Sequence, residues 1–324
     1  GEVTFNHGGV NGATVGGVAG WIVSSSQTGG SNNGAVTYNG LATKTASVWL
    51  GGYAGHMGAV ASVANIKNTK PMTVSFDGTA ISYVGGICGR WDATSVENVA
   101  NTADATITVN KMPVGATTGD RYIYIAGVVG LNNVKATYKN CKNEAAIVAK
   151  NELKVNNQVF VSGLAGRDEM ASTYDGCSNS GNITLDMPNG TGHGGNSCIS
   201  GIAGASGASN IFSNCSNTGN MSIKCPGNAF RIGGIAGYNG GSGKCTGCTV
   251  DSDIEVLATI TTPHIGGMVG YSNPGKYVDC SYSGKISCST GSLGGILGYT
   301  KSNQTMEGCT VNAEVGTGST AGLF

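Results

Sequence analysis

The sequence has few charged residues, few aromatic residues and little proline. Charged residues make up 11% of the 324 positions, and 18 basic residues balance 18 acidic ones. An average globular domain has roughly 25% charged residues. A net charge of zero excludes the strongly basic surface by which proteins bind nucleic acid or anionic membranes. We therefore expect no nucleic-acid partner.

Long hydrophobic runs and metal-binding patterns are also missing. Glycine and polar residues interrupt every apolar run before the ~18 residues that a membrane-spanning helix needs. The four histidines show no ligand spacing, and the single Cys-x-x-Cys, Cys245 to Cys248, falls at positions that are apolar in other copies of the repeat described below. We expect no transmembrane segment in this chain, no metal and no cofactor.

Glycine, in contrast, is abundant, with 56 residues, and much of it lies in one repeated motif. The motif reads apolar-small-Gly-apolar-apolar-Gly and occurs in nine complete copies, with the start of a tenth at the C-terminus. The final glycines are Gly20, Gly55, Gly89, Gly130, Gly166, Gly204, Gly237, Gly270 and Gly298. A period of about 30 to 40 residues is typical of a solenoid or a propeller, in which one unit is stacked many times.

Two further positions recur after each glycine motif. About eleven residues on lies an apolar residue, and six residues beyond it another, as in the copy that contains Cys215 and Met221. Each copy therefore predicts roughly three short strands. The sequence favours an all-β fold: a right-handed parallel β-helix, or β-solenoid, of about ten rungs, where a rung is one turn of the coil. It predicts one domain over 1–324, with 1–14 as an N-terminal cap and 15–324 as the repeats. A β-propeller is the alternative.

The small and polar residues of the repeat suggest columns along the coil. Six cysteines from Cys141 to Cys309 take the place of Ile66 and Val99, which predicts buried thiols in an apolar column. An asparagine two residues later, from Asn68 to Asn217, predicts a ladder of stacked amides. The invariant glycines need either a positive φ or space for another backbone. Cys198 and Cys225 fit neither column, and the sequence leaves open whether they form a disulfide.

The combination of GGIAGY and NCSNTGNMSI resembles the GLUG-type glycine-rich repeats of bacterial cell-surface proteins, including adhesin-like proteins of gut Bacteroidota. The resemblance covers about 15–324, and the early copies depart from it because they lack the cysteine. It implies export, an extracellular or bacterial cell-surface location and a binding role, and it carries over no catalytic residue.

The residue after each final glycine is expected to repeat on one face. Three consecutive copies place Tyr238, Tyr271 and Tyr299 there, which predicts an aromatic platform for sugar rings or a partner. Trp21 and Trp91, with Trp49, suggest a second aromatic patch. The charged segments nearest this face contain Arg90 with Asp92, and Arg167 with Asp168 and Glu169. Insertions around 111–121, 150–158 and 191–197 suggest that recognition occurs near the middle of the coil.

The sequence thus predicts a non-enzymatic surface protein that binds a glycan or a surface protein. No paired carboxylates at matching positions support catalysis, although a carbohydrate-active β-helix enzyme, a lyase or a hydrolase, is the first alternative. A passive stalk is the second. The chain starts at Gly1-Glu2, so we expect a processed form, with a lipid anchor upstream as one mode of attachment.

Overall fold

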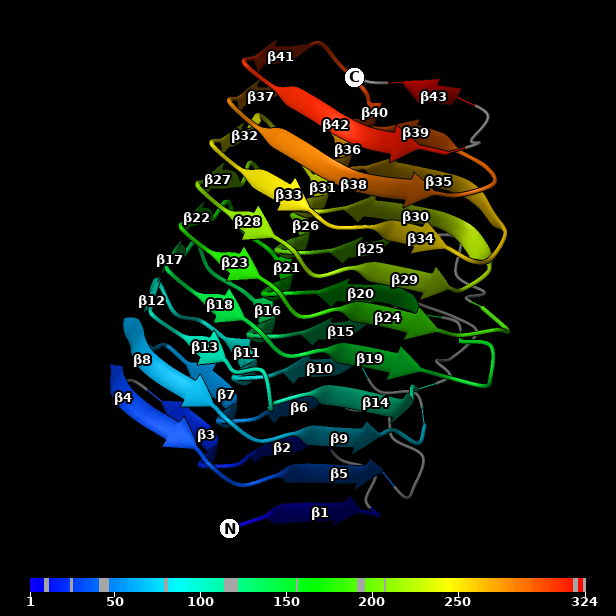
Figure 1. Ribbon diagram of the computed structural model, residues 1–324. Helices are drawn as coiled ribbons and strands as arrows, with labels where there is room; N and C mark the ends of the chain where they lie inside the picture. The colour runs from blue at the N-terminus through cyan, green and yellow to red at the C-terminus, as the bar shows by residue number, and fades with distance from the viewer. Residues whose placement is uncertain are drawn as a thin grey trace.

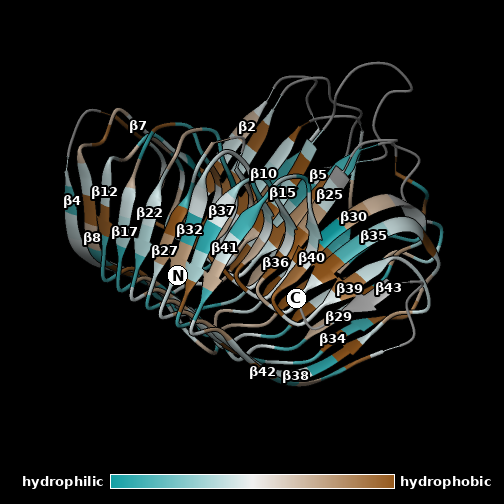
Figure 2. Cartoon of the chain, turned by 90° about the horizontal axis from the view of Figure 1, so that it is seen from above, coloured by the Kyte–Doolittle hydropathy of each residue, from teal (hydrophilic) through white to brown (hydrophobic). Residues whose placement is uncertain are grey.

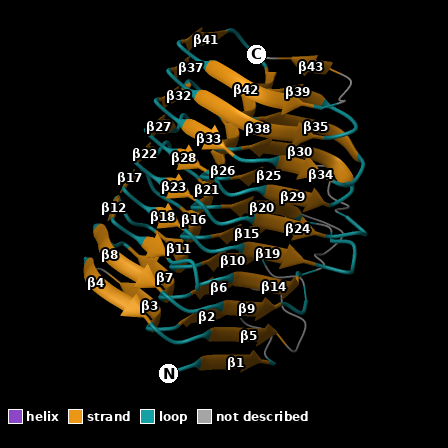
Figure 3. Ribbon diagram, in the orientation of Figure 1, coloured by secondary structure: helices purple, strands orange, loops and turns teal. Residues whose placement is uncertain are grey.

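The structure is a computed structural model that describes residues 1–8, 12–23, 26–40, 47–78, 81–113, 122–155, 157–190, 196–206, 208–316 and 320–322. Over these residues the chain forms β-strands, turns and loops, and no helix (Figure 3). The strands wind into a coil with the N-terminus at one end and the C-terminus at the other (Figure 1). The fold is a parallel β-solenoid with three sheets, as the sequence predicted.

Sheet I carries the first half of each glycine motif, and all its strand pairs are parallel. Its ten strands are β2 (Ala13–Gly16), β6 (Val48–Gly51), β10 (Ser82–Gly85), β15 (Tyr122–Ala126), β20 (Gln158–Ser162), β25 (Asn196–Ser200), β30 (Gly227–Gly233), β35 (Ile260–Gly266), β39 (Ser292–Gly294) and β43 (Thr320–Gly322).

Sheet II begins two residues after the first invariant glycine of the motif, and its strands contain the final glycine. Its nine strands are β3 (Ala19–Val23), β7 (Ala54–Gly58), β11 (Cys88–Trp91), β16 (Val129–Asn132), β21 (Ala165–Asp168), β26 (Ala203–Ser206), β31 (Ala236–Asn239), β36 (Val269–Ser272) and β40 (Leu297–Thr300).

Sheet III holds the rest of each turn, and it bends at the cysteine column, where most turns change strand. Its 24 strands are β1 (Val3–His7), β4 (Gln27–Asn32), β5 (Val36–Gly40), β8 (Ser62–Asn68), β9 (Met72–Ser75), β12 (Ser95–Glu97), β13 (Ala100–Asn101), β14 (Ile107–Lys111), β17 (Thr137–Lys139), β18 (Lys142–Asn143), β19 (Ile147–Lys150), β22 (Thr173–Asp175), β23 (Ser178–Asn179), β24 (Ile183–Asp186), β27 (Ile211–Ser213), β28 (Ser216–Asn217), β29 (Met221–Lys224), β32 (Gly243–Thr246), β33 (Thr249–Asp251), β34 (Ile254–Val256), β37 (Gly275–Val278), β38 (Ser281–Ser287), β41 (Gln304–Glu307) and β42 (Thr310–Val315).

The number of turns is lower than predicted. Sheet II has nine strands, so the described residues do not form ten complete rungs. The tenth glycine motif contributes only β43 to sheet I, and Leu323 and Phe324 lie outside the described residues. At the other end, β1 pairs in parallel with β5 and so continues sheet III below the first glycine motif.

The inside of the coil is a continuous apolar core. Equivalent positions of successive turns pair directly, as in Ile147 with Ile183 and Ile183 with Met221. The cysteine column lies in this core: Cys177, Cys215 and Cys248 are buried. Each of these three thiols donates to a carbonyl of the preceding turn, at 3.5 to 3.6 Å. The prediction that these cysteines act as small core residues is confirmed. Figure 2, which views the coil from above, shows hydrophobic residues on strands of all three sheets.

The asparagine ladder is also confirmed, and it begins one turn earlier than predicted. Asn32 Nδ2 donates to Asn68 Oδ1 at 2.8 Å, and the same bond recurs through Asn101, Asn143 and Asn179 to Asn217. It ends where Asn217 Nδ2 donates to Ser252 Oγ at 3.0 Å. Buried amides are stabilised here because each donor has an acceptor in the next turn.

The ladder explains why the third position of the motif, occupied by Gly163 in one copy, is always glycine. Gly163 does not have a positive φ; instead, a Cβ there would meet the carbonyl oxygen of Gly201 and the side chain of Asn179. A positive φ recurs instead at the residue before the cysteine column. Asn140 and Asn214 have φ of 52°, and Gly176 has 60°. Asparagine and glycine are the residues that tolerate this left-handed conformation best.

Candidate binding surface

Sheets I and II present two columns of large side chains on the outside of the coil. Side chains alternate between the two faces of a strand. Ile123 and Ile125 therefore belong to the core, whereas Tyr124 belongs to a separate cluster outside it. The column of sheet I contains Trp49, Tyr83, Tyr124, Phe160, Cys198, Arg231 and His264. The column of sheet II contains Trp21, His56, Arg90, Leu131, Arg167, Ala205, Tyr238, Tyr271 and Tyr299.

Contacts between the columns show that they form one surface, which we call the aromatic–arginine face. At its N-terminal end, Trp49 packs against Trp21, with ring centroids 6.2 Å apart, and against His56 at 5.0 Å. The guanidinium of Arg90 lies 6.0 Å from the Trp49 ring centroid. Trp21 is 58% exposed, so the predicted position of this tryptophan on the surface is consistent with the structure.

The middle of the face is a stack of buried aromatic rings with a partly exposed arginine beside it: Tyr83, Tyr124 and Phe160 are 8%, 2% and 3% exposed. Tyr83, Tyr124 and Phe160 stack along the coil with ring centroids 5.2 and 5.0 Å apart. Arg167 lies 5.9 Å from the Phe160 centroid, and its Nη1 donates to Tyr124 Oη at 3.4 Å. Its Nη2 donates to Glu169 Oε2 at 3.3 Å. Arg167 and Glu169 thus lie together on the surface, as the sequence suggested.

The C-terminal part contains the predicted tyrosines. Tyr238, Tyr271 and Tyr299 are in register, with ring centroids 5.5 and 5.0 Å apart. The guanidinium of Arg231 lies 4.2 Å from the Tyr238 centroid and 4.3 Å from that of Tyr271, a close cation–π geometry. His264 packs against Tyr299 at 4.5 Å. The structure therefore brings the three tyrosines together.

Sequence reasoning found only Trp49 of the sheet I column and did not recognise the column. Its signal is a large or basic residue two positions before the first small residue of the motif, as with Phe160 before Ser162 and Arg231 before Gly233. These residues stand between apolar ones, which is the alternation expected of a strand with two covered faces. Two of the three predicted insertions lie largely outside the described residues, since 114–121 and 191–195 are not described, whereas 150–158 is described except for 156.

Trp91 is not a surface residue, and its assignment to an aromatic patch was wrong. It is fully buried, and its Nε1 donates to Tyr138 Oη at 3.2 Å inside the coil. Arg90, the preceding residue, lies on the outer face, so the alternation of the strand turns Trp91 inward. Trp91 contributes to the core rather than to binding.

Asp168 is likewise inside the coil, although it was predicted to lie on the binding face. It is fully buried. Asn132 Nδ2 donates to Asp168 Oδ1 at 3.0 Å, and Tyr174 Oη donates to Asp168 Oδ2. Burial raises the pKa of Asp168 to about 6, while the hydrogen bonds from Tyr174 and Asn132 lower it in part. The carboxyl group has no path to a ligand on the outer face.

The raised pKa of Asp168 makes stability depend on pH. The folded-state pKa of about 6 exceeds the ordinary value of 3.8, so the folded protein binds this proton more tightly than the unfolded chain does. The contribution of proton binding to stability is fully present below the unfolded pKa and is lost as pH rises through about 6. We expect the free energy of unfolding to fall by on the order of 3 kcal/mol between about pH 4 and pH 7 because of this group. Urea unfolding across this range, compared with Asp168→Asn, measures the effect. Equal pH slopes for the two proteins would contradict it.

Burial also affects the two histidines of the face. It lowers the pKa of His56, and Arg90 lowers it further, whereas Asp92, 4.0 Å from His56 Nε2, opposes the shift. Burial and Arg231 lower the pKa of His264. Both rings are therefore neutral at neutral pH, and the positive charge of the face belongs to its arginines.

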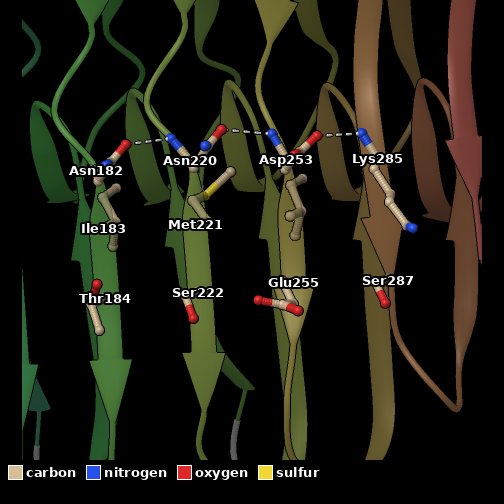
Figure 4. A pocket seen from close by; sticks show the side chains of 11 residues that line it. Asn182, Ile183, Thr184, Asn220, Met221, Ser222, Asp253, Glu255, Lys285 and Ser287 are labelled. Carbon is tan, nitrogen blue, oxygen red and sulfur yellow. Dashed lines mark hydrogen bonds between the residues drawn. The ribbon is translucent and has the colours of Figure 1, made fainter.

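A second surface feature lies on the outside of sheet III. A groove of about 340 Å³ crosses four turns, and Thr184, Ser222, Glu255 and Ser287 form a row along it (Figure 4). At its edge, a side-chain oxygen of each turn accepts the backbone N–H of the next, as where Asn220 N donates to Asn182 Oδ1 at 2.9 Å and Asp253 N to Asn220 Oδ1 at 2.9 Å. No aromatic residue lines the groove, and its edge oxygens already have partners.

No group of three or more metal-ligating side chains occurs in the part of the chain that the structure describes. Cys198 is a buried thiol on the aromatic–arginine face, not a disulfide partner. Cys225 is buried as well. Among the described residues there is no helix long and apolar enough to span a membrane.

Comparison with protein-family models, with curated proteins and with solved structures gives no match for this chain.

Proposed function

We propose that this chain is a non-enzymatic, exported cell-surface repeat protein, adhesin-like in its role, that binds a glycan or a host or partner protein through one exposed face of the coil. The observation that carries this proposal is the aromatic–arginine face. There, rings and guanidinium groups follow one another along the outside of sheets I and II over successive turns. Aromatic residues and arginine are the side chains most enriched where proteins bind partners.

The fold and the sequence pattern support the remaining parts of the proposal. A solenoid offers an extended surface on which one kind of side chain can recur at each turn. Strands on the near side of Figure 1 point to the right while the chain climbs from the N-terminus, which supports the right-handed winding that we include in the proposal. Export, a surface location and membership of the GLUG-type repeat proteins rest on the motif resemblance.

The burial of Asp168 weakens the enzyme alternative. A glycoside-cleaving site needs carboxylates that reach the substrate. Asp168 lies inside the coil, so only Glu169 of its segment is near the surface. The passive-stalk alternative gives no reason for the guanidinium of Arg231 to lie against the rings of Tyr238 and Tyr271.

A glycan array tests the proposed function. We expect binding of at least one glycan, weakened about tenfold by Tyr271→Ala, because a stacked ring contributes on the order of 1 kcal/mol. Thr184→Ala, on the sheet III groove, is the matched control and should bind as the unaltered protein does. Cleavage of a polymer would favour the enzyme. If the protein binds neither glycans nor cell-surface proteins, the passive-stalk alternative remains.

A further inference from the structure

We propose that the aromatic–arginine face binds an anionic polysaccharide, with carboxylate or sulfate groups recurring along its chain, that lies parallel to the axis of the coil. This inference rests on the proposed function and narrows its ligand to one chemical class. Three features of the face carry it: the spacing of the arginines, their unpartnered donors, and the aromatic rings between them.

The arginines are evenly spaced along the coil. Arg90 pairs with Leu131 and Leu131 with Arg167, so the two arginines lie two turns apart in the sheet II column. Arg231 lies two turns beyond, in the sheet I column, because it pairs with Cys198, and Cys198 pairs with a residue of the strand just before Arg167. Two turns correspond to about 9.6 Å, twice the spacing between neighbouring strands. This distance is comparable with the length of a disaccharide, so a polymer with one acidic sugar in each disaccharide would meet an arginine at every repeat.

The face also holds buried donors without acceptors. Nε of Arg90, Arg167 and Arg231 is buried and makes no hydrogen bond, and the same is true of Trp49 Nε1. Guanidinium and indole N–H groups can only donate. An unpaired buried donor is costly, and anionic oxygens are its strongest acceptors. These four donors all belong to side chains of the aromatic–arginine face.

The charge of the face is only partly balanced by the protein. Arg90 Nε lies 3.8 Å from Asp92 Oδ1, and Arg167 is bonded to Glu169. Arg231 has no acidic partner among the described residues, and two tyrosine rings hold its guanidinium in place. The C-terminal part of the face therefore carries a fixed, uncompensated positive charge next to rings on which sugars can stack.

A glycan fits this face better than an extended acidic peptide. The strands of sheets I and II are paired on both sides over most of the coil, so the surface offers no free strand edge to which a peptide backbone could add. The exposed rings of Trp21 and Tyr299, at the two ends of the face, instead offer flat apolar surface near the guanidinium groups. The face therefore matches a chain of rings with regularly placed anionic groups.

Matched pairs of polymers test the inference. Binding is measured by calorimetry for polygalacturonate against its methyl ester, for dextran sulfate against dextran, and for polyglutamate. We expect an acidic polysaccharide to bind and its uncharged counterpart not to. Arg231→Gln should weaken binding at least tenfold, and Arg231→Lys should restore part of it, because lysine keeps the charge but loses the planar fork. Lys224→Gln, which removes a charge from sheet III, should have no effect.

The outcomes separate this inference from the proposed function. Preference for polygalacturonate or for dextran sulfate supports it and identifies the anionic group. Equal binding of charged and uncharged polymers, weakened by Tyr271→Ala, overturns it and leaves the proposed function intact. Binding of polyglutamate alone overturns it in favour of an acidic protein partner. If no polymer binds, the inference fails, and the glycan array decides the proposed function separately. Circular dichroism shows that each variant is folded, and Arg90→Gln repeats the test at a second site.

Discussion

Gly163→Ala is expected to lower the free energy of unfolding by about 3 kcal/mol or more, because the added methyl group has no room. A Cβ at Gly163 would overlap the carbonyl oxygen of Gly201, in the next turn, and the amide of Asn179 in the ladder. Overpacking of a well-packed interior typically costs 1–3 kcal/mol, and here both neighbours are held by hydrogen bonds of their own. Urea unfolding followed by circular dichroism measures the loss.

The adjacent residue provides the control for this prediction. Ser162 occupies the small position of the same motif, where another copy has Ala126. Ser162→Ala removes one hydroxyl, which lies 3.1 Å from Ser200 Oγ, and should cost about 1 kcal/mol or less. If Gly163→Ala proves as stable as Ser162→Ala, close approach is not the reason for the glycine.

Trp91→Ala is expected to lower the free energy of unfolding by about 3–5 kcal/mol, the usual cost of removing a large buried aromatic side chain. The indole is fully buried and packs against Tyr138, with ring centroids 6.1 Å apart. The substitution leaves a cavity within one turn and removes the donor to Tyr138 Oη. Thermal or urea unfolding measures the change.

Trp21→Ala is the matched comparison, since it removes the same side chain from an exposed position. Trp21 is 58% exposed, so its loss should change stability by about 1 kcal/mol at most. The reverse order, with the Trp21 variant less stable, would show that the assignment of these two tryptophans to surface and core is mistaken.

The repeat period was enough to predict the columns of the coil. A cysteine that takes the place of Ile66 or Val99 must share its environment, and Cys177, Cys215 and Cys248 are indeed buried in one column. The amide ladder followed from the same argument, because identical residues at one offset stack at the spacing of strands. A regular repeat in the sequence therefore predicts which residues stack on one another in the structure.

Finer features needed coordinates. The sequence cannot distinguish a glycine that needs a positive φ from one that needs space, and the structure assigns the second reason to Gly163. Trp91 and Asp168 were placed outside because both follow an outward arginine, although the alternation of a strand turns each inward. Apart from Trp49, the sheet I column was missed because its members share a position in the repeat but no residue type.

The amide ladder also gives the molecule an electrical direction. From Asn32 to Asn179, each side-chain Nδ2 donates to the asparagine of the next turn, and from Asn68 to Asn217 each Oδ1 accepts from the turn before it. Amide dipoles that point the same way along one line add together and polarise one another. The rod therefore has inequivalent poles, built from uncharged groups in a chain whose net charge is zero.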